Sequence, residues 1–591
     1  MLKQILLPTI LLILGYGFWV SPDFKEISAG VAIFLFGMLS LEEGFKAFSG
    51  GTLEKVLKKS TDKLYKSVGF GIITTTFMQS SSLVSVLTIS FLGAGLIGLA
   101  QGIGIIFGAN IGTTTGAWLV AGFGLKVHIS SYAMPMLVFG VILIFQKSKT
   151  YKGIGYILAG LGFLFLGIHY MKEGFEAFKD SLDLASFAVS GLKGLFIFTG
   201  IGIFATVVMQ SSHATLVLII TALSVGQITY ENALALAIGA NVGTTITAII
   251  GSMSSNIDGK RLAGAHLIFN VVTGLIAIIF MSQIMVAVDI SSEFFGIASD
   301  DHTLKLAVFH TIFNIIGVVV MLPFVNKLVT FLEDFLKDKD ADKSEIEHTK
   351  YLNDSVLELP ATAIATIRKE TQHLYENAFE IIAHGINVKR RNIKSDMDLD
   401  KVIQDDFSKE AINIDKFYTQ KIKYLYGEIL DFSTKAQFNM SAEYNKELYN
   451  LKLANRDIVE AVKDTKHLQK NLVKYSKNEN SHIQAEYNLI RRDLAELLRT
   501  IYLVSTLDTQ ADITIQLSKA KILMEKQDII ANGKLDNLIR QSLVSNEMAT
   551  SLMNDSTYAY GISKDLIAMA EILFLDADNL VMNEDEVNSV I

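Results

Sequence analysis

The sequence predicts an all-α membrane protein with many membrane crossings, followed by a soluble helical bundle. Half of the 591 residues are hydrophobic and the mean hydropathy is +0.38, which excludes an ordinary soluble domain. Apolar segments of membrane-spanning length recur up to about residue 332, and they contain an internal repeat. Beyond residue 350 the apolar residues recur every three or four positions in charged sequence, which is typical of packed amphipathic helices.

Ten apolar segments are expected within a membrane part that we place at residues 1–335. The first, MLKQILLPTILLILGYGFWV, is interpreted as a membrane helix with Trp19 at the interface. A removed signal peptide is less favoured, because no small-residue cleavage site precedes Ser21 and Pro22. The segments near 68–92 and 195–225 are interrupted by polar residues and are predicted to be broken or re-entrant helices. The ten segments are approximately 2–20, 27–41, 68–92, 95–121, 129–146, 153–171, 191–226, 232–252, 262–289 and 304–332.

Composition excludes several other classes of protein. The formal net charge is −8 and no basic face is apparent, so no nucleic-acid partner is expected. The chain has no cysteine, which excludes a disulfide framework, a thiolate zinc site and a thiol nucleophile. No activated nucleophile or acid and base pair is visible, so we expect neither an enzyme nor a cofactor.

The polar interruptions belong to a duplicated unit, with copies at about 30–150 and 160–290. The stretch GFGIITTTFMQSSSLVSVLTI (69–89) recurs as GIGIFATVVMQSSHATLVLII (200–220), and the separation from Gln79 to Gln210 defines the repeat offset. Downstream, GANIGTTTGAWLV recurs as GANVGTTITAII at this same offset, and upstream EGFKAF recurs as EGFEAF at an offset shorter by one position. Three matches at nearly one offset indicate duplication rather than chance.

Loop charges predict that the two copies are inverted in the membrane, because Lys and Arg favour the cytoplasmic side. The loop before the second copy's polar cluster mixes acidic and basic residues and is expected outside. The residues expected inside are Lys46, Lys55, Lys58, Lys59, Lys63 and Lys66 before the first cluster, and Lys147, Lys149 and Lys152 between the copies. Inverted repeats with broken helices are the architecture of many secondary transporters.

A break inside a membrane helix can create an ion site. The new helix N-terminus offers backbone N–H groups to an anion, and serine hydroxyls can add donors. Carbonyl, amide and hydroxyl oxygens are hard ligands suited to sodium. The alternative is that small polar residues only bond within or between helices. We favour a shared site for an oxyanion and its driving cation, because both copies keep the same spacing from Gln79 to Asn110 and from Gln210 to Asn241.

Histidines in the apolar segments have two interpretations. HLIFN and HTIFN each place a His and an Asn four residues apart on one helix face, as His266 with Asn270 and His310 with Asn314. They could support the ion site from beside it, but we favour side-chain pairs that hold two helices together. A fifth residue, His213, stands where the first copy has a serine, and a structural donor is favoured there over a metal ligand.

These motifs together resemble the type II sodium/phosphate cotransporter family, over roughly residues 30–332. The resemblance rests on the QSSS and QSSH clusters, the two GAN(I/V)GTT stretches and the two HxxFN helices. It implies phosphate and sodium sites at the duplicated clusters. The phosphate-binding residues that it implies are Gln79, Ser80, Ser81, Ser82, Gln210, Ser211 and Ser212, to which we add His213. The matching partners, with a sodium-binding or site-lining role, are Asn110, Thr113, Thr114, Asn241, Thr244 and Thr245. His213 departs from the usual Ser or Thr of the family.

The C-terminal part resembles the PhoU-like helical bundles that are fused to bacterial members of this family. We place a charged linker at 336–350 and a cytoplasmic bundle at 351–591. The acidic metal-cluster motifs of PhoU proteins are incomplete here, so no metal beyond sodium is expected. The bundle could regulate transport, bind a cytoplasmic signalling partner, or pack and form a homodimer.

The expected function is sodium-coupled phosphate symport by alternating access, in the inner membrane of a bacterium. The sequence leaves two alternatives open, a phosphate exporter of the same fold and a membrane phosphate sensor without sodium-driven flux. The expected partners are phosphate, sodium and the lipid bilayer.

Overall fold

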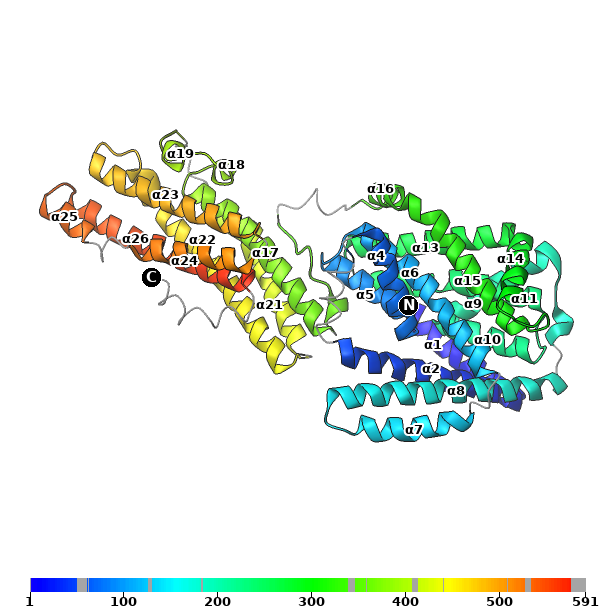
Figure 1. Ribbon diagram of the computed structural model, residues 1–591. Coiled ribbons are helices and arrows are strands. Elements are labelled where there is room, and N and C mark those ends of the chain that lie inside the picture. Colours follow the sequence, from blue (N-terminus) through cyan, green and yellow to red (C-terminus); the bar gives the residue numbers. More distant parts are fainter. Residues whose placement is uncertain are drawn as a thin grey trace. The chain divides into compact units, whose positions relative to one another are not determined.

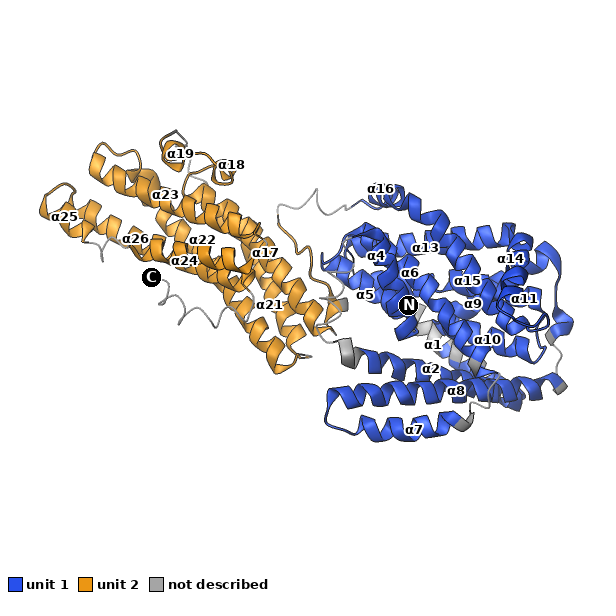
Figure 2. Ribbon diagram, viewed as in Figure 1, with its two compact units in different colours: residues 1–338 blue, residues 339–591 orange. Residues whose placement is uncertain are grey.

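The computed structural model of the chain is built from helices, with no strand among the described residues, and it divides into two compact units (Figures 1 and 2). Unit 1 comprises residues 1–338 and unit 2 residues 339–591. The division falls inside the predicted charged linker, of which 338–345 lie outside the described residues. The structure describes residues 2–49, 61, 63–125, 130–181, 184–253, 255–337, 346–357, 359–405, 413–438, 440–507, 509–526 and 533–575.

Unit 1 holds seven helical segments that are long and apolar enough to cross a membrane, within the part of the chain that is described. Three shorter apolar helices accompany them, and two of these directly follow the predicted breaks. The polytopic all-α fold predicted from the sequence is therefore confirmed. The helices of unit 1 are α1 (Leu2–Val20), α2 (Pro22–Ser49), α4 (Leu64–Met78), α5 (Ser81–Gly93), α6 (Leu99–Trp118), α7 (Ser130–Ile144), α8 (Lys149–Ser181), α9 (Gly191–Met209), α10 (Ser212–Ser224), α11 (Tyr230–Gly243), α12 (Thr245–Ser252), α13 (Ile257–Ile279), α14 (Met281–Phe294), α15 (His302–Met321) and α16 (Val325–Phe335).

Helices α2 and α8 pack along each other through glycines, and they run side by side in Figure 1. A Cβ on Gly30 would lie 2.9 Å from the carbonyl oxygen of Gly167, and a Cβ on Gly37 would lie 2.7 Å from that of Gly160. From the first contact to the second, the residue number rises by seven in α2 and falls by seven in α8, so the two helices are antiparallel. The offset between the two EGF motifs also separates Gly30 from Gly160 and Gly37 from Gly167, so these glycines are equivalent positions of the two copies. The contact is thus reciprocal, as at an interface with a two-fold axis.

The two copies also share their closest internal packing. In the first copy, a Cβ on Gly71 of α4 would lie 2.1 Å from the carbonyl oxygen of Ile105 in α6. In the second, a Cβ on Gly202 of α9 would lie 2.3 Å from the carbonyl oxygen of Leu236 in α11. The two glycines are separated by the repeat offset, and so are the two residues that they contact. The duplication therefore preserves a backbone contact that only glycine permits.

Three apolar segments contain breaks that the sequence analysis did not predict. The segment expected at 262–289 ends one helix and starts another at Phe280, and the segment at 232–252 changes helix at Thr244. The segment at 304–332 passes through a 3-10 turn, Leu322–Phe324, whose central Pro323 has no N–H to continue an α-helix. Of the lysines used to orient the first copy, Lys55, Lys58 and Lys59 lie outside the described residues.

Unit 2 is a bundle of amphipathic helices around one apolar core, as the periodicity predicted. Long α22 packs against α17 and α26, and α23 packs against α24 and α26. Its helices are α17 (Pro360–Gly385), α18 (Arg390–Ile393), α19 (Leu399–Asp405), α20 (Ile414–Phe417), α21 (Tyr424–Gln437), α22 (Ala442–Tyr475), α23 (Ser481–Val504), α24 (Gln510–Lys526), α25 (Lys534–Arg540) and α26 (Asn546–Phe574).

Candidate functional site at the two broken helices

Both polar clusters interrupt a helix with the same backbone turn. Helix α4 ends at Met78 and α9 at Met209, and the next residue in each case is left-handed, Gln79 with φ 52° and Gln210 with φ 53°. These are the two non-glycine residues of unit 1 with positive φ among the described residues. A glutamine in this conformation is uncommon and strained, and strained backbone clusters at functional sites. The predicted breaks are therefore present, each at its glutamine.

A serine then caps the new helix in each copy. Ser80 accepts a hydrogen bond from the amide of Leu83 at 3.2 Å, and Ser211 accepts one from the amide of Ala214 at 3.1 Å. The first amides of a helix have no partner within it, and each cap satisfies only one of them. The N-termini of α5 and α10 therefore retain donors for an external acceptor, next to the side chains of Ser81 and Ser212.

The two breaks contact each other directly through His213. Its Nδ1 lies 3.0 Å from the carbonyl oxygen of Gln79, which belongs to the other copy. Because a carbonyl only accepts, Nδ1 carries a proton, and the neutral ring then presents Nε2 as an acceptor. Nε2 is buried and has no hydrogen-bond partner within the described part of the chain. The residue is 4% exposed, so His213 has one ring nitrogen bonded to the other copy and one that is buried and unpaired.

Hydroxyl contacts join the same breaks through the end of α11. Ser212 donates to Thr244 at 3.3 Å, and the hydroxyl oxygen of Thr247 lies 3.3 Å from that of Ser82, in the other copy. The one hydroxyl proton of Thr247 goes to the carbonyl oxygen of Thr244 at 2.8 Å, because a carbonyl only accepts, so Ser82 is the donor in its contact with Thr247. A continuous set of polar groups thus runs from the start of α5 to the start of α10.

The repeat relates the pair of Ser82 and Thr247 to a second pair with different side chains. The residue of the second copy that is equivalent to Ser82 is His213, and the residue of the first copy that is equivalent to Thr247 is Gly116. A Cβ on Gly116 would lie 2.4 Å from both Cε1 and Nε2 of the imidazole. The first pair joins two small hydroxyl side chains, and the second joins a large ring to a glycine. Gly116 therefore leaves the space in which His213 fits.

Asn241 connects α11 to α15 through two side chains. It donates from Nδ2 to Oδ1 of Asn314 at 2.8 Å, and its Oδ1 lies 3.0 Å from Nε2 of His310. This is the interhelical His and Asn pairing favoured from the sequence for HTIFN. In both motifs the Asn donates to the backbone carbonyl of its own His, Asn270 to His266 and Asn314 to His310. The HLIFN motif differs in the amide oxygen of Asn270, which has no interhelical partner among the described residues such as Asn314 has. Oδ1 of Asn270 and Nδ1 of His266 are buried without a partner among the described residues.

The remaining predicted residues bond mainly within their own helices. Asn110 donates to Ile106 at 2.9 Å, so it does not repeat the role of Asn241. Thr113 and Thr114 of the same helix donate to the carbonyl oxygens of Ala109 and Ile111. Thr245, the first residue of α12, donates to that of Val242 near the end of α11. These bonds match the alternative in which Thr and Asn bond back to the helix.

Burial separates the predicted residues into two groups. Gln210 is exposed, whereas its counterpart Gln79 is half-buried and donates to Thr115 at 3.1 Å. The half-buried residues are Gln79, Ser80, Ser82, Ser211 and Thr113. The buried ones are Ser81, Asn110, Thr114, Ser212, His213, Asn241, Thr244, Thr245, His266, Asn270, His310 and Asn314.

Sequence reasoning missed three residues of this cluster, Thr115, Gly116 and Thr247. The repeat carried the signal, because Gly116 and Thr247 occupy equivalent positions with different side chains. No group of three or more His, Cys, Asp or Glu side chains suited to a metal occurs in the part of the chain that the structure describes.

Comparison with known proteins adds a family to this geometry. The model of the family described as "Na+/Pi-cotransporter" matches the chain twice, at residues 33–173 and 184–324. Over this span, the chain is similar to the Na+/Pi-cotransporter family. Each match contains one of the broken helices, so the family's own repeat coincides with the duplication. The family model covers unit 1 and does not extend into unit 2.

Curated proteins that are similar to this chain include those of three bacteria. The "Putative inorganic phosphate export protein YjbB" of Escherichia coli (strain K12) is 27% identical over 61% of this chain, and that of Salmonella typhimurium is 24% identical over 61%. The chain spans 64% of the length of both relatives. The "Uncharacterized protein YqeW" of Bacillus subtilis is 26% identical over 51% of this chain and 94% of its own length. No solved structure matches the chain.

Proposed function

We propose that the protein carries inorganic phosphate across a membrane. The observation that carries this proposal is the meeting of two broken helices inside an apolar unit, where His213 contacts the carbonyl of Gln79. Two helix N-termini with free amides and serine hydroxyls suit a tetrahedral oxyanion, because each can donate to different oxygens. The proposal involves no chemical change of phosphate, in keeping with a transporter family rather than an enzyme family.

The alternating-access part of the proposal rests on the reciprocal glycine contacts. When a two-fold axis relates two antiparallel helices, the axis is perpendicular to them. If both helices span the membrane, the axis therefore lies in the membrane plane. Each copy would pass through the conformation of the other, which opens the site first to one side and then to the opposite side. The contacts of Gly30 with Gly167 and of Gly37 with Gly160 support this arrangement.

Sodium coupling is the second element of the proposal. Sodium would reduce the charge that phosphate brings to the site, with oxygen ligands drawn from the set that includes Asn110, Thr114, Asn241 and Thr244. Each elementary charge moved against 100 mV costs about 2.3 kcal/mol, so the coupling ratio sets how concentrative transport is. The relatives named as putative export proteins favour net export of phosphate rather than uptake. The same site would serve both directions.

We place the protein in the inner membrane of a bacterium, with unit 2 in the cytoplasm as a PhoU-like regulatory bundle. The support is its amphipathic helical core and its position after the last membrane helix. In this role it would bind a cytoplasmic signalling partner or a second copy of the chain. If the protein were instead a sensor, it would bind phosphate at the same site without transporting it.

Uptake of labelled phosphate into proteoliposomes tests the transport proposal. We expect accumulation under an inward sodium gradient and little in matched potassium. Replacing Ser81 or Ser212 by Ala should abolish it, because each stands at a helix N-terminus of the site. Ser224→Ala is the matched control, since it lies at the far end of the same helix as Ser212 and bonds to the carbonyl oxygen of Thr221.

The outcomes separate the alternatives. Phosphate gradient-driven efflux without net uptake would identify an exporter. Phosphate binding with no flux in either salt would favour the sensor. Capture of a signalling partner by the full chain would then support that alternative. Normal flux in both Ser81→Ala and Ser212→Ala would contradict the assignment of the site.

A further inference from the structure

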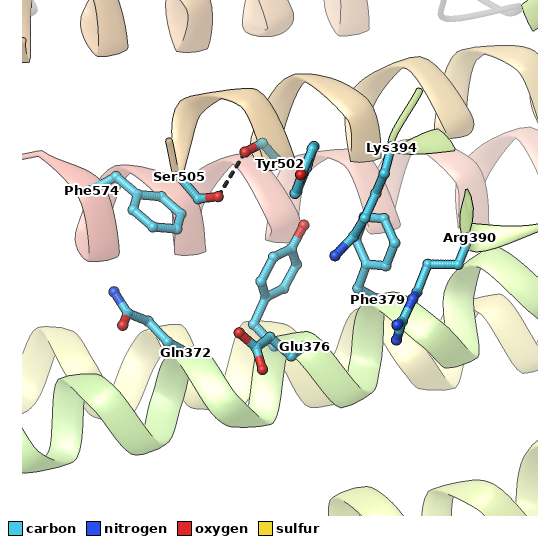
Figure 3. A pocket seen from close by; sticks show the side chains of 9 residues that line it. Gln372, Glu376, Phe379, Arg390, Lys394, Tyr502, Ser505 and Phe574 are labelled. Atoms are coloured by element: carbon cyan, nitrogen blue, oxygen red, sulfur yellow. Dashed lines mark hydrogen bonds between the residues drawn. The ribbon is translucent and has the colours of Figure 1, made fainter. Parts of the chain in front are cut away.

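Unit 2 contains a cavity that the transport proposal does not use. Its volume is about 390 Å³, within the range of small-molecule pockets, about 300 to 1,000 Å³. Helices α17, α18, α23 and α26 contribute side chains to it, so it lies between four elements of one compact unit. Figure 3 shows Phe574 at one end of this pocket and Lys394 with Arg390 at the other, with Glu376 between them.

The cationic end is held between aromatic rings. Nζ of Lys394 lies 4.6 Å from the ring centroid of Tyr502 and 5.2 Å from that of Phe379, both within cation–π range. Neither Lys394 nor Arg390 has a carboxylate at salt-bridge distance among the described residues. Arg390 does attract Glu380, but that carboxylate pairs with Lys421 at 2.8 Å. Two cations on one cavity wall, neither at salt-bridge distance from a carboxylate of the described residues, suit a phosphate group.

A buried hydroxyl also lines the cavity. Tyr375 is 7% exposed, and its OH has no hydrogen-bond partner within the described residues. Leaving such a buried donor unpaired is unfavourable, and a ligand acceptor would relieve it. Burial raises the pKa of Tyr375 far above its usual value, so the hydroxyl remains a donor at all physiological pH values.

The wall that carries the cations is fixed by two arginines of α23, the half-buried Arg499 and the buried Arg491. Arg499 donates to the carbonyl oxygens of Ile393 and Asn392, at 2.9 and 3.0 Å. Arg491 donates to that of Ile386 at 3.0 Å and to that of Asn387 at 2.8 Å. These bonds attach the turn and short helix before Lys394 to α23, so the cations stand on a pre-formed wall rather than on a free loop.

We propose that this pocket of unit 2 binds a nucleotide, with the phosphates at Lys394 and Arg390 and the base against Phe574. Glu376 lies between these ends and accepts hydrogen bonds from ribose hydroxyls. An inorganic anion alone would leave the aromatic end and the acceptor unused. The proposal concerns unit 2 alone and does not depend on phosphate transport.

Calorimetric titration of the full-length protein in detergent with ADP, pyrophosphate and adenosine tests this inference. We expect ADP to bind at least about tenfold more tightly than either fragment, since both ends of the pocket then contribute. Lys394→Gln and Arg390→Gln should each weaken ADP binding about tenfold or more, because each removes a charge-assisted contact. Phe574→Ala should weaken ADP and adenosine but leave pyrophosphate unchanged.

Arg391→Gln is the matched control, because Arg391 is the exposed neighbour of Arg390 and does not line the cavity. It should bind ADP as the unaltered chain does, and far-ultraviolet circular dichroism should show that all variants remain folded. Pyrophosphate binding as tightly as ADP would overturn the nucleotide assignment. So would ADP binding that Lys394→Gln does not change, or the absence of ADP binding at millimolar concentration.

Discussion

The pairing of His213 with Gly116 predicts that substitutions at these two positions are coupled. Gly116→Thr introduces the residue that the other copy has at Thr247, and its Cβ would lie 2.4 Å from two atoms of the imidazole. Ordinary contacts exceed 3.4 Å, so the ring must move by about 1 Å, and overpacking of this kind costs about 1 to 3 kcal/mol. The displaced ring also loses its 3.0 Å contact with the carbonyl of Gln79, worth about 1 kcal/mol.

His213→Ser should cost stability for the opposite reason, because it leaves a void beside Gly116. The double variant H213S/G116T recreates the Ser82 and Thr247 pair, whose hydroxyls lie 3.3 Å apart. It should therefore be more stable than the sum of the two single changes predicts, by about 2 kcal/mol. That coupling corresponds to roughly a 30-fold difference in the unfolding equilibrium.

Thermal unfolding of the four proteins in one detergent measures this coupling, and phosphate flux in proteoliposomes gives a second readout. Gly69→Ala serves as a control for added volume, since a Cβ there meets nothing within 4 Å. Strict additivity of the two single changes would refute the reasoning. It would mean that the ring and the glycine do not share space.

Three further predictions concern packing, ionisation and a missing hydrogen bond. Gly71→Ala, whose Cβ would lie 2.1 Å from a backbone oxygen, should lower the thermal unfolding midpoint of unit 1 and reduce flux, whereas Gly69→Ala on the same helix should not. Burial raises the pKa of Asp493 to about 7, so its favourable contribution to the free energy of unfolding is present below about pH 4 and is lost as the pH rises to 7. The loss is at most about 4 kcal/mol. Asp493→Asn should abolish it when the unfolding of unit 2 is measured against pH. In the second copy Thr206 donates to Thr215, and the equivalent residues of the first copy are Thr75, whose buried Oγ1 is unpaired among the described residues, and Val84. By this equivalence, Val84→Thr should supply the missing partner, stabilise the protein by about 1 kcal/mol and raise the unfolding midpoint; an unchanged or lower midpoint would contradict this.

The broken helices could be predicted from the sequence because two independent signals coincide there. Polar residues interrupt long apolar segments, and the interruptions recur at the repeat offset. A duplicated glutamine and serine cluster must serve the same backbone conformation twice, and both glutamines are left-handed in the structure. The break at Thr244 escaped prediction because the repeat does not mark it: the equivalent residue of the first copy, Thr113, lies within the uninterrupted helix α6.

Contacts between distant segments could not be predicted from local patterns. Asn110 and Asn241 occupy equivalent positions, yet Asn241 bonds to α15 and Asn110 bonds to its own helix. The difference arises from which helix lies opposite each residue, and the repeat carries no information on that. The same holds for His213, whose partner is a backbone carbonyl in the other copy.

The two copies therefore preserve the backbone more strictly than the side chains. Glycine contacts and left-handed glutamines recur at the repeat offset, whereas Ser82 with Thr247 has become His213 with Gly116. Another buried pair shows the same pattern, since Thr206 donates to Thr215 at 3.0 Å and the equivalent of Thr215 is an apolar residue. An alternating mechanism needs both copies to reach the same backbone conformations, which explains the first set. It places no such demand on the side chains of the candidate site, so these are free to differ, and in the proposed transport cycle they would give the two halves unequal free energies.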